Sequence, residues 1–139
     1  MSPRQSTCVA IGARAVLLEG APGSGKSSLA LALIDRGATL VGDDGVGLEV
    51  ADGLLLASPH PATEGLIEVR NLGLLRMPAA RSVPVCLVCT LEANAPRFVE
   101  HAGDVAIGGL RIPHLTLSPD SPVSAIKVEL ALERYGLGV

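Results

Sequence analysis

The chain has 139 residues, of which 48% are hydrophobic, and its formal net charge is −3. That length is common for one domain, and the apolar content excludes a disordered chain. A general nucleic-acid surface is disfavoured, because the charge is negative and only one Phe and one Tyr could stack on bases. We therefore expect one globular domain over residues 1–139, with a core of Leu, Val, Ala and Ile.

In chain order, short apolar runs separated by turn residues indicate strands. They fall at residues 8–20 (two strands), 38–44, 45–58 (a hairpin), 66–78 (a strand at its start), 83–92 and 107–119 (further short strands). Two further segments, 24–37 and 122–136, indicate helices. Because strands outnumber helices and several neighbours look hairpin-connected, we expect an α/β fold with a strand-rich mixed sheet and few helices.

Turn residues set the ends of these elements. The first two strands are expected to turn within residues 12–14, and Asp52 with Gly53 forms a tight hairpin turn. Gly37 is placed to end the first helix. Pro122 and Gly136 stand near the start and the end of the last helix.

The three cysteines are Cys8, Cys86 and Cys89. The last two spell C-x-x-C, a spacing that redox and zinc sites use. Here they lie in a continuous apolar strand, so we expect buried core thiols that point to opposite faces of the sheet. Free thiols favour a reducing, cytoplasmic setting, and neither a signal peptide nor an apolar run of membrane-spanning length is evident.

A glycine-rich loop follows the apolar strand AVLLE and opens the first helix. It consists of Gly20, Ala21, Pro22, Gly23, Ser24, Gly25, Lys26 and Ser27. Glycines let backbone amides converge on a phosphate, and the helix N-terminus adds positive potential. In this pattern Lys26 reaches the β- and γ-phosphates, and the Ser27 hydroxyl can bind Mg²⁺. The loop therefore predicts nucleotide or phosphate binding, but it does not define a reaction.

Two acidic residues, Asp43 and Asp44, end the strand that follows the first helix. In an extended segment they would point to opposite sides, so that one faces the phosphates and the other binds backbone or metal. Glu68 and Arg70 share a strand face further along. Glu68 could complete a Mg²⁺ shell and Arg70 could balance phosphate charge, although an exposed ion pair explains them equally well.

Taken together, GAPGSGKSSLALALIDRGATLVGDD and GLIEVRNLGLL resemble the catalytic domain of HPr kinase/phosphorylase. That family shows a G-x-S-G-x-G-K-S loop, a LIxRGxxLVADD segment and the signature EVRGLGI. The three motifs occur in order, and the resemblance covers roughly residues 5–135. It is to a short form without the family's N-terminal domain.

The resemblance implies a bacterial enzyme that uses ATP and Mg²⁺ to phosphorylate a serine of HPr, the phosphocarrier of the sugar phosphotransferase system. It also implies removal of that phosphate by phosphorolysis, a P-loop core similar to phosphoenolpyruvate carboxykinase, and a hexamer. Carried over by motif, Lys26 grips the phosphates, and Ser27 and Glu68 bind Mg²⁺. The base that takes the serine proton falls best on Asp44, with the adjacent Asp43 left open.

A catalytic arginine, which the family carries later in an R-L-G context, falls on Arg97 of APRFVE, with Arg111 as the other candidate. The family also has a His about fifteen residues before the loop. His60, His101 and His114 do not match it, so we expect them to be surface or structural histidines.

The chain departs from the family pattern at several places. These are Gln5 for His, Pro22 for Ser, Ser28 for an acidic residue, Asn71 for Gly, and residues 118–122 (SPDSP) for the PGRN stretch tied to dephosphorylation. Gln cannot exchange a proton near neutral pH, Pro22 offers no N–H, and Asp120 would repel phosphate. The departures therefore bear more on phosphorolysis than on nucleotide binding, with kinase activity between the two.

Three functions remain open from the sequence. The first is an active serine kinase of the HPr type. The second is a nucleotide-binding regulator with reduced chemistry, and the third is a P-loop kinase that acts on another protein or a small molecule.

Overall fold

The computed structural model describes residues 1–119 and 121–139. Within these residues the chain forms eleven strands and two helices. The strands are β1 (Ser2–Arg4), β2 (Thr7–Ile11), β3 (Arg14–Glu19), β4 (Thr39–Gly42), β5 (Val46–Ala51), β6 (Leu54–Pro59), β7 (Leu66–Val69), β8 (Gly73–Arg76), β9 (Val83–Leu91), β10 (Gly103–Ile107) and β11 (Leu110–Leu117). The helices are α1 (Lys26–Asp35) and α2 (Ser124–Tyr135). The expected strand-rich α/β fold is confirmed.

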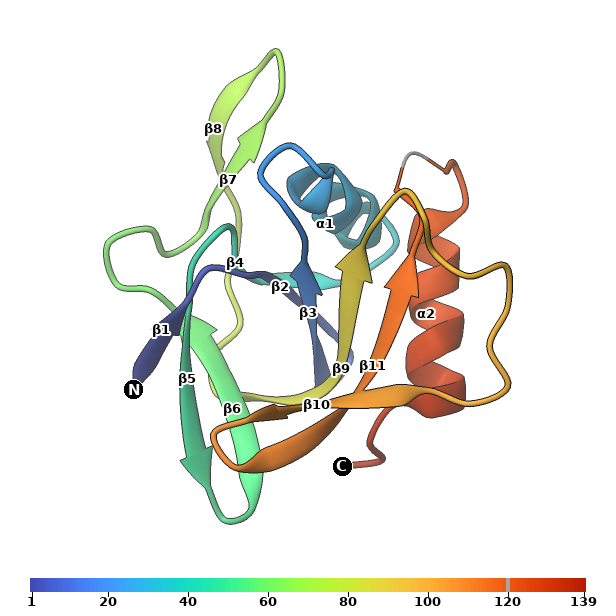
Figure 1. Cartoon of the computed structure of the whole chain (residues 1–139). Coiled ribbons are helices and arrows are strands. Elements are labelled where there is room, and N and C mark those ends of the chain that lie inside the picture. The colour runs from blue at the N-terminus through green and yellow to red at the C-terminus, as the bar shows by residue number, and fades with distance from the viewer. Residues whose placement is uncertain (120) are drawn as a thin grey trace.

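The main sheet mixes parallel and antiparallel neighbours. Strands β3, β9 and β11 are parallel, and β2 and β4 extend the sheet beside β3 by antiparallel pairing. Strand β6 pairs antiparallel with the start of β9. Strand β5 then pairs antiparallel with β6, and β1 pairs antiparallel with β5. Figure 1 shows the parallel strands ending at one edge, close to the loop that leads into α1. Ligand sites commonly form at that edge of such sheets.

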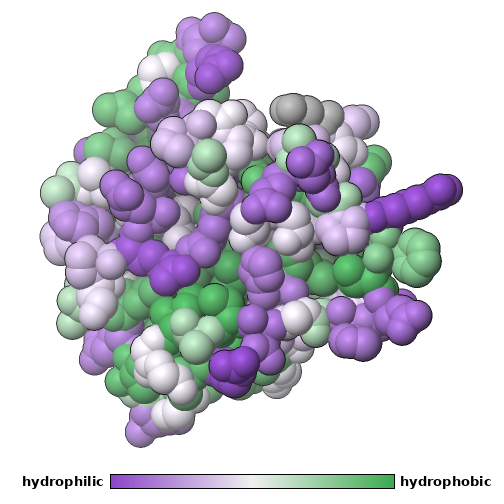
Figure 2. Space-filling model, viewed as in Figure 1, coloured by the Kyte–Doolittle hydropathy of each residue, from purple (hydrophilic) through white to green (hydrophobic). Residues whose placement is uncertain are grey.

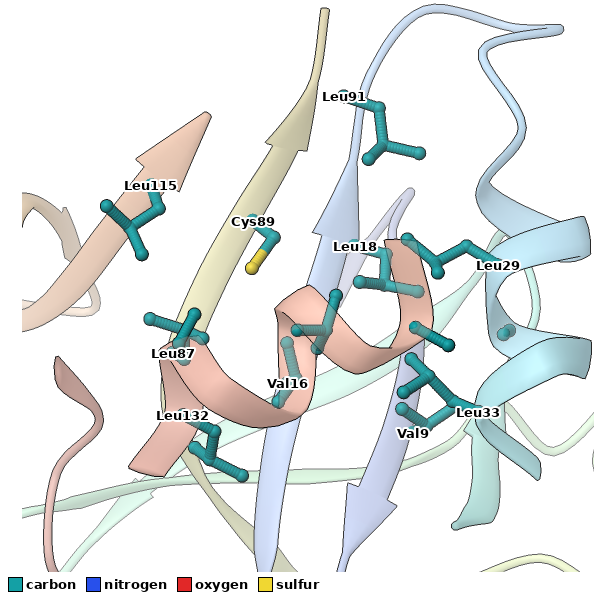
Figure 3. Close-up of a cluster of buried hydrophobic side chains, with 14 of the residues drawn as sticks. Val9, Val16, Leu18, Leu29, Leu33, Leu87, Cys89, Leu91, Leu115 and Leu132 are labelled. Atoms are coloured by element: carbon teal, nitrogen blue, oxygen red, sulfur yellow. The ribbon is translucent and has the colours of Figure 1, made fainter. Parts of the chain in front are cut away.

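One core fills the space between the sheet and the two helices. Val16 and Leu18 of β3 pack in the same cluster as Leu33 of α1 and Leu132 of α2, and all four are buried. Figure 3 shows the labelled side chains of both helices meeting those of the strands. A second core lies on the other face of the sheet, where Leu17 joins buried residues of β5 and β6. The alternation of Val16, Leu17 and Leu18 between the cores follows from the two-residue period of a strand.

The cysteines are free and buried, as expected, but their predicted orientation is wrong. Cys86 and Cys89 belong to the same core, on the helix side of the sheet. The pairing of β9 with β3 explains this, because Ala15 pairs with Val85 and Val16 pairs with Leu87. Cys86 is therefore the extra residue of a β-bulge, which shifts the alternation by one position. Burial raises the pKa of Cys89 to about 12, so this thiol is poorly suited to redox chemistry.

The hairpin turn at Asp52 and Gly53 is confirmed, with φ values of 53° and 75° that suit a tight turn between β5 and β6. A second hairpin, β7–β8, forms its own two-stranded sheet and projects from the body in Figure 1. It replaces the single expected strand at residues 66–78, and Arg70 lies in its turn rather than on a strand face beside Glu68.

On the face seen in Figure 2, hydrophilic and hydrophobic side chains are interspersed. The large apolar residues with the greatest exposure include Leu72 and Leu74 of the projecting hairpin, at 71% and 67%. Neither α1 nor α2 has the length and apolarity that a membrane-spanning helix needs, as judged over the residues described.

Candidate active site

The glycine loop (residues 20–27) connects the end of β3 to α1. Its glycines adopt positive φ angles of 149° at Gly20, 79° at Gly23 and 99° at Gly25. A Cβ added to Gly20 would lie 2.6 Å from the Ser24 Oγ atom and 3.1 Å from the Leu91 carbonyl oxygen. Residues with side chains rarely tolerate both constraints, so the loop needs glycine at this position.

The loop ends at the N-terminus of α1, where Gly25 is the N-cap residue and makes no side-chain cap. Lys26 and Ser27 therefore occupy the first turn, in which backbone amides lack partners within the helix. The first turn also holds no acidic side chain. The amides, the helix dipole and the Lys26 ammonium together favour an anion at this point.

Asp43 is the hydrogen-bonding centre of the site. Its Oδ1 atom accepts bonds from the Ser27 hydroxyl at 2.6 Å and the Thr7 hydroxyl at 3.1 Å. Its Oδ2 atom accepts a bond from the Glu68 backbone N–H at 2.9 Å. One carboxylate thus fixes the glycine loop, the β2 strand and the base of the β7–β8 hairpin relative to one another.

Asp44 differs from the extended conformation expected of it. Its φ is 54°, in the left-handed region, and its side chain is 67% exposed. The Asp44 Oδ1 atom lies 3.6 Å from the Lys26 Nζ atom, while the Lys26 side chain is only 12% exposed. The backbone turn therefore brings both carboxylates to the glycine loop, instead of sending them to opposite sides.

Thr7 is a site residue that sequence reasoning missed. It is fully buried at the start of β2. Its hydroxyl donates to Asp43, and it accepts the Asp44 backbone N–H at 3.2 Å. A hydroxyl in an otherwise apolar strand, TCVAI, is a signal that could have drawn attention to it. Thr7 holds both neighbouring acidic residues in their observed conformations.

A cavity of about 460 Å³ opens beside the loop. Gly23, Gly25, Lys26 and Ser27 line one part of it, together with Glu68 and Arg70. The remaining predicted loop residues, Gly20, Ala21, Pro22 and Ser24, shape the loop but do not line the cavity. No ion pair joins Glu68 to Arg70 in the described part of the chain, so the alternative of a paired, purely surface role is not supported.

Asp43 and Asp44 do not line this cavity, and neither do Arg97, Arg111 and Gln5. Arg97 is exposed in the segment between β9 and β10. Arg111 is ion-paired with Asp104 at 2.7 Å near the start of β11, at the opposite end from the glycine loop. Gln5 is exposed between β1 and β2. Asp120 of the SPDSP stretch lies outside the described residues.

The residues around Ser27 suit Mg²⁺ chemically. Hydroxyl and carboxylate oxygens are the ligands that Mg²⁺ prefers, and it commonly takes one or two protein ligands with phosphate and water completing its shell. Ser27 and Asp43 provide such oxygens 2.6 Å apart, and Glu68 lines the same cavity. The described residues form no cluster of three or more His, Cys, Asp or Glu, so a metal here would depend on nucleotide oxygens as well.

A second polar cluster, formed by Arg4, Ser6 and Glu19, lies at the end of β3 just before the glycine loop. Glu19, the last residue of β3, accepts bonds from Arg4 at 2.6 and 3.0 Å and also from the Ser6 hydroxyl. Burial alone would raise the pKa of Glu19, but the bonds from Arg4 and Ser6 and the Arg4 charge lower it below its usual value. The ionised Glu19 therefore ties β1 to the residue that precedes the glycine loop.

Comparison with known proteins places these features in a family. Residues 3–81, more than half of the chain, match the family model described as HPr Serine kinase C-terminal domain. HPr kinase/phosphorylase of Exiguobacterium sibiricum is 33% identical over 137 residues, covering 88% of this chain and 44% of that protein. The Clostridium tetani HPr kinase/phosphorylase is 44% identical over 64 residues, which are 46% of this chain and 21% of that protein. The chain thus spans less than half the length of these relatives.

A solved structure agrees in fold. The structure titled as the Hpr(Ser) kinase/phosphatase from Coxiella burnetii superposes with a TM-score of 0.84, covering 96% of this chain and 95% of that one. Its sequence identity of 23% supports similarity of fold rather than of activity. On the extent of the family match, the chain belongs to the HPr serine kinase C-terminal domain family.

Proposed function

We propose that this chain is the catalytic domain of an ATP-dependent serine kinase of the HPr kinase/phosphorylase type, with an HPr-like phosphocarrier protein as acceptor. Family membership and the names of the relatives support this proposal. The observation that carries it is the unequal environment of two adjacent carboxylates. Asp43 accepts three hydrogen bonds, whereas Asp44 is exposed beside Lys26.

The environment of each carboxylate suggests its role. In this proposal the nucleotide phosphates bind at the glycine loop and Lys26, and bound Mg²⁺ would neutralise charge on the phosphate oxygens. Asp43 holds Ser27 and the Glu68 backbone in place for phosphate and metal. Asp44, which has no comparable set of partners in the described residues, takes the proton from the serine hydroxyl.

The proposed transfer moves one proton and one phosphoryl group. The serine O–H bond breaks and its proton goes to Asp44, while the serine oxygen forms a bond to the γ-phosphorus. The bond from that phosphorus to the bridging oxygen of ATP breaks, and ADP leaves. Lys26, 3.6 Å from Asp44, keeps a positive charge beside both the carboxylate and the phosphates. In the reverse direction Asp44 would return the proton.

Arg97 is proposed to neutralise charge on the transferred phosphoryl group when the acceptor protein is bound. Its segment, residues 92–102, is mostly exposed and could reach the acceptor rather than the cavity wall. A cytoplasmic location and assembly into a homo-oligomer, a hexamer in the proposed family pattern, belong to the same proposal.

A second candidate is a nucleotide-binding regulator with reduced chemistry. It is favoured by Gln5, which replaces the histidine expected from the family and is exposed outside the cavity lining. Without a group there that can exchange a proton near neutral pH, phosphorolysis should be affected most.

Incubation with labelled ATP, Mg²⁺ and an HPr-like protein tests the first proposal. We expect phosphate on a serine of the acceptor, with a serine-to-alanine acceptor as the control. Nucleotide binding without transfer would reject the kinase proposal and favour the regulator.

A further inference from the structure

Asp44 holds a backbone conformation that depends on residues far away in the chain. Its φ of 54° lies in the left-handed region, which residues other than glycine rarely adopt. Such a conformation persists only where the surrounding structure holds it in place. Two backbone N–H groups of this turn make long-range bonds, from Asp44 to the Thr7 hydroxyl at 3.2 Å and from Gly45 to the Ser6 carbonyl oxygen at 3.1 Å. The turn is therefore fixed by Ser6 and Thr7, which are adjacent in the chain.

Ser6 is itself held by its backbone and by its side chain. Its N–H donates to the Arg4 carbonyl oxygen at 3.0 Å, which closes a tight turn between β1 and β2. Its hydroxyl donates to the Glu19 carboxylate, and Ser6 is fully buried. Arg4 donates to the same carboxylate through two nitrogen atoms, at 2.6 and 3.0 Å. Glu19 therefore binds both ends of the turn whose Ser6 carbonyl oxygen accepts the Gly45 bond.

Glu19 is also joined to the glycine loop, because it is the last residue of β3 and directly precedes the loop. A continuous set of bonds thus runs from the Glu19 carboxylate through Ser6 to the Gly45 backbone, one residue from Asp44. At the other end of the loop, the Lys26 Nζ atom lies 3.6 Å from the Asp44 Oδ1 atom. Because the Asp44 side chain is largely exposed, its place beside Lys26 depends mostly on where its backbone is held.

We propose that Glu19 and Ser6 are positioning residues for phosphate transfer, which act through the Gly45 backbone to set the place of Asp44 relative to the glycine loop. The proposal rests on the role proposed above for Asp44 as the group that takes the serine proton. Neither Glu19 nor Ser6 lines the cavity, so their effect falls on the transfer step rather than on nucleotide binding. A general base must lie within hydrogen-bond reach of the proton it takes, so a small displacement slows transfer.

The chain offers a matched pair of substitutions for the test. Arg36 of α1 and Glu129 of α2 form an ion pair of the same kind, in which the Arg36 Nε atom donates to the Glu129 Oε1 atom at 2.9 Å. The side chains of Glu19 and Glu129 are 22% and 27% exposed. Glu19→Gln and Glu129→Gln therefore remove the same charge from similar surroundings, but only Glu19 is linked to Asp44. A difference between the two variants reports that link and not the loss of an ion pair in general.

Single-turnover phosphate transfer from ATP to an HPr-like protein and the Kd for ATP are measured in both variants. We expect Glu19→Gln to slow transfer about tenfold, while the Kd for ATP changes by no more than about twofold, because a misplaced base lowers the rate of the chemical step alone. Glu129→Gln should match wild type in both quantities. Equal slowing in the two variants would overturn the inference. A raised Kd for ATP at an unchanged transfer rate would also overturn it, because Glu19 would then act on the glycine loop.

A second variant keeps the test independent of the charge change. Ser6→Ala removes the hydroxyl that donates to Glu19 and leaves the Arg4–Glu19 pair intact. It should slow transfer about threefold in the wild-type background, since only one of the three bonds to the carboxylate is lost. In an Asp44→Asn background it should slow transfer no further, because the displaced side chain no longer takes the proton. Equal slowing in both backgrounds would overturn the inference, since Ser6 would then act on the protein as a whole.

Hydrogen exchange of the Gly45 amide tests the link without any activity. This amide should exchange about tenfold faster in Glu19→Gln and Ser6→Ala than in Glu129→Gln, because the Ser6 carbonyl oxygen that binds it is held less firmly. Unchanged exchange in both variants would overturn the inference, whatever the rate of transfer. Wild-type protein that binds ATP but transfers no phosphate would reject the proposed kinase, and the exchange rates would still decide whether Glu19 and Ser6 hold the Asp44 turn in place.

Discussion

The two regions that carry the predicted catalytic residues are built differently. The glycine loop and the end of β4 are joined by hydrogen bonds through Asp43, which links elements far apart in sequence. The segment of residues 92–102 is mostly exposed, and its backbone bonds include one from Glu92 to Leu117 and one from Ala95 to Glu92. The fold thus positions the first region before any ligand binds, whereas the role proposed for Arg97 in the second region would require the acceptor to position its side chain.

The largest expected loss of phosphate transfer and ATP binding comes from a substitution in the glycine loop. Lys26→Met should abolish detectable phosphate transfer and weaken ATP binding by more than a hundredfold, because Lys26 is the cation of the glycine loop. The chain has one other lysine, Lys127, which is exposed on α2. Lys127→Met should leave both quantities unchanged, and equal losses in the two variants would show that the loop has no special role. Titration with nucleotide and a transfer assay measure both.

A smaller loss of activity is expected when Asp43 and Asp44 lose their hydrogen bonds to Thr7. Thr7→Val keeps the shape of the side chain but removes the hydroxyl shared by Asp43 and the Asp44 N–H. We expect kcat to fall about tenfold with little change in KM for ATP, and the free energy of unfolding to fall by about 1–3 kcal/mol. Thr7→Ser should restore most of kcat. A loss of stability in both variants with unchanged kcat would reduce Thr7 to a structural residue.

Arg97 is the direct probe of the exposed region. Arg97→Ala should lower transfer to the protein acceptor about tenfold but leave the Kd for ATP unchanged, because Arg97 does not line the cavity. Arg111→Ala should change neither, since Arg111 is paired with Asp104 away from the loop. A weakened Kd for ATP in Arg97→Ala would place this segment over the nucleotide even without the acceptor.

The smallest effect concerns pH. The pKa of Glu19 is lowered in the folded protein, so its contribution to stability is present above the usual glutamate pKa of about 4.3 and is lost as pH falls through the lower folded value. Glu19→Gln should therefore be less stable than wild type at neutral pH, and the difference should shrink below about pH 4. Thermal unfolding at several pH values measures it. A difference that stays constant with pH would mean that the Arg4–Glu19 pair contributes no charge-dependent stability.

Patterns within single elements were predictable from sequence. The loop spacing, the α1 helix and the Asp52–Gly53 turn each depend on a local run of residues, and the structure confirms them. The features that the sequence did not predict depend on pairing between elements. The bulge at Cys86 arises from the register of β9 against β3, which a single strand does not reveal. The left-handed backbone of Asp44 likewise depends on its bond to Thr7, 37 positions away in the chain.

Some residues of the candidate site were predicted from the sequence, and others were not. Lys26 and Ser27 were predicted from the glycine-loop motif and Glu68 from the resemblance to the family, and the structure gathers all three at one cavity. Arg97 was assigned through a weaker local context, and its position relative to the cavity depends on a long exposed connection. Thr7 has no motif, because a hydroxyl that positions another side chain can come from any neighbouring strand.

We propose that Asp44, and not Asp43, takes the serine proton. Asp44→Asn and Asp43→Asn are compared in single-turnover transfer of labelled phosphate from ATP to an HPr-like protein, with ATP binding measured in parallel. We expect Asp44→Asn to slow transfer by about 10²–10⁴-fold, the usual contribution of a general base, with ATP binding within threefold of wild type. Asp43→Asn should impair ATP–Mg²⁺ binding as well, because it disturbs Ser27 and Glu68. Transfer by Asp44→Asn at the wild-type rate would show that Asp44 is not the base.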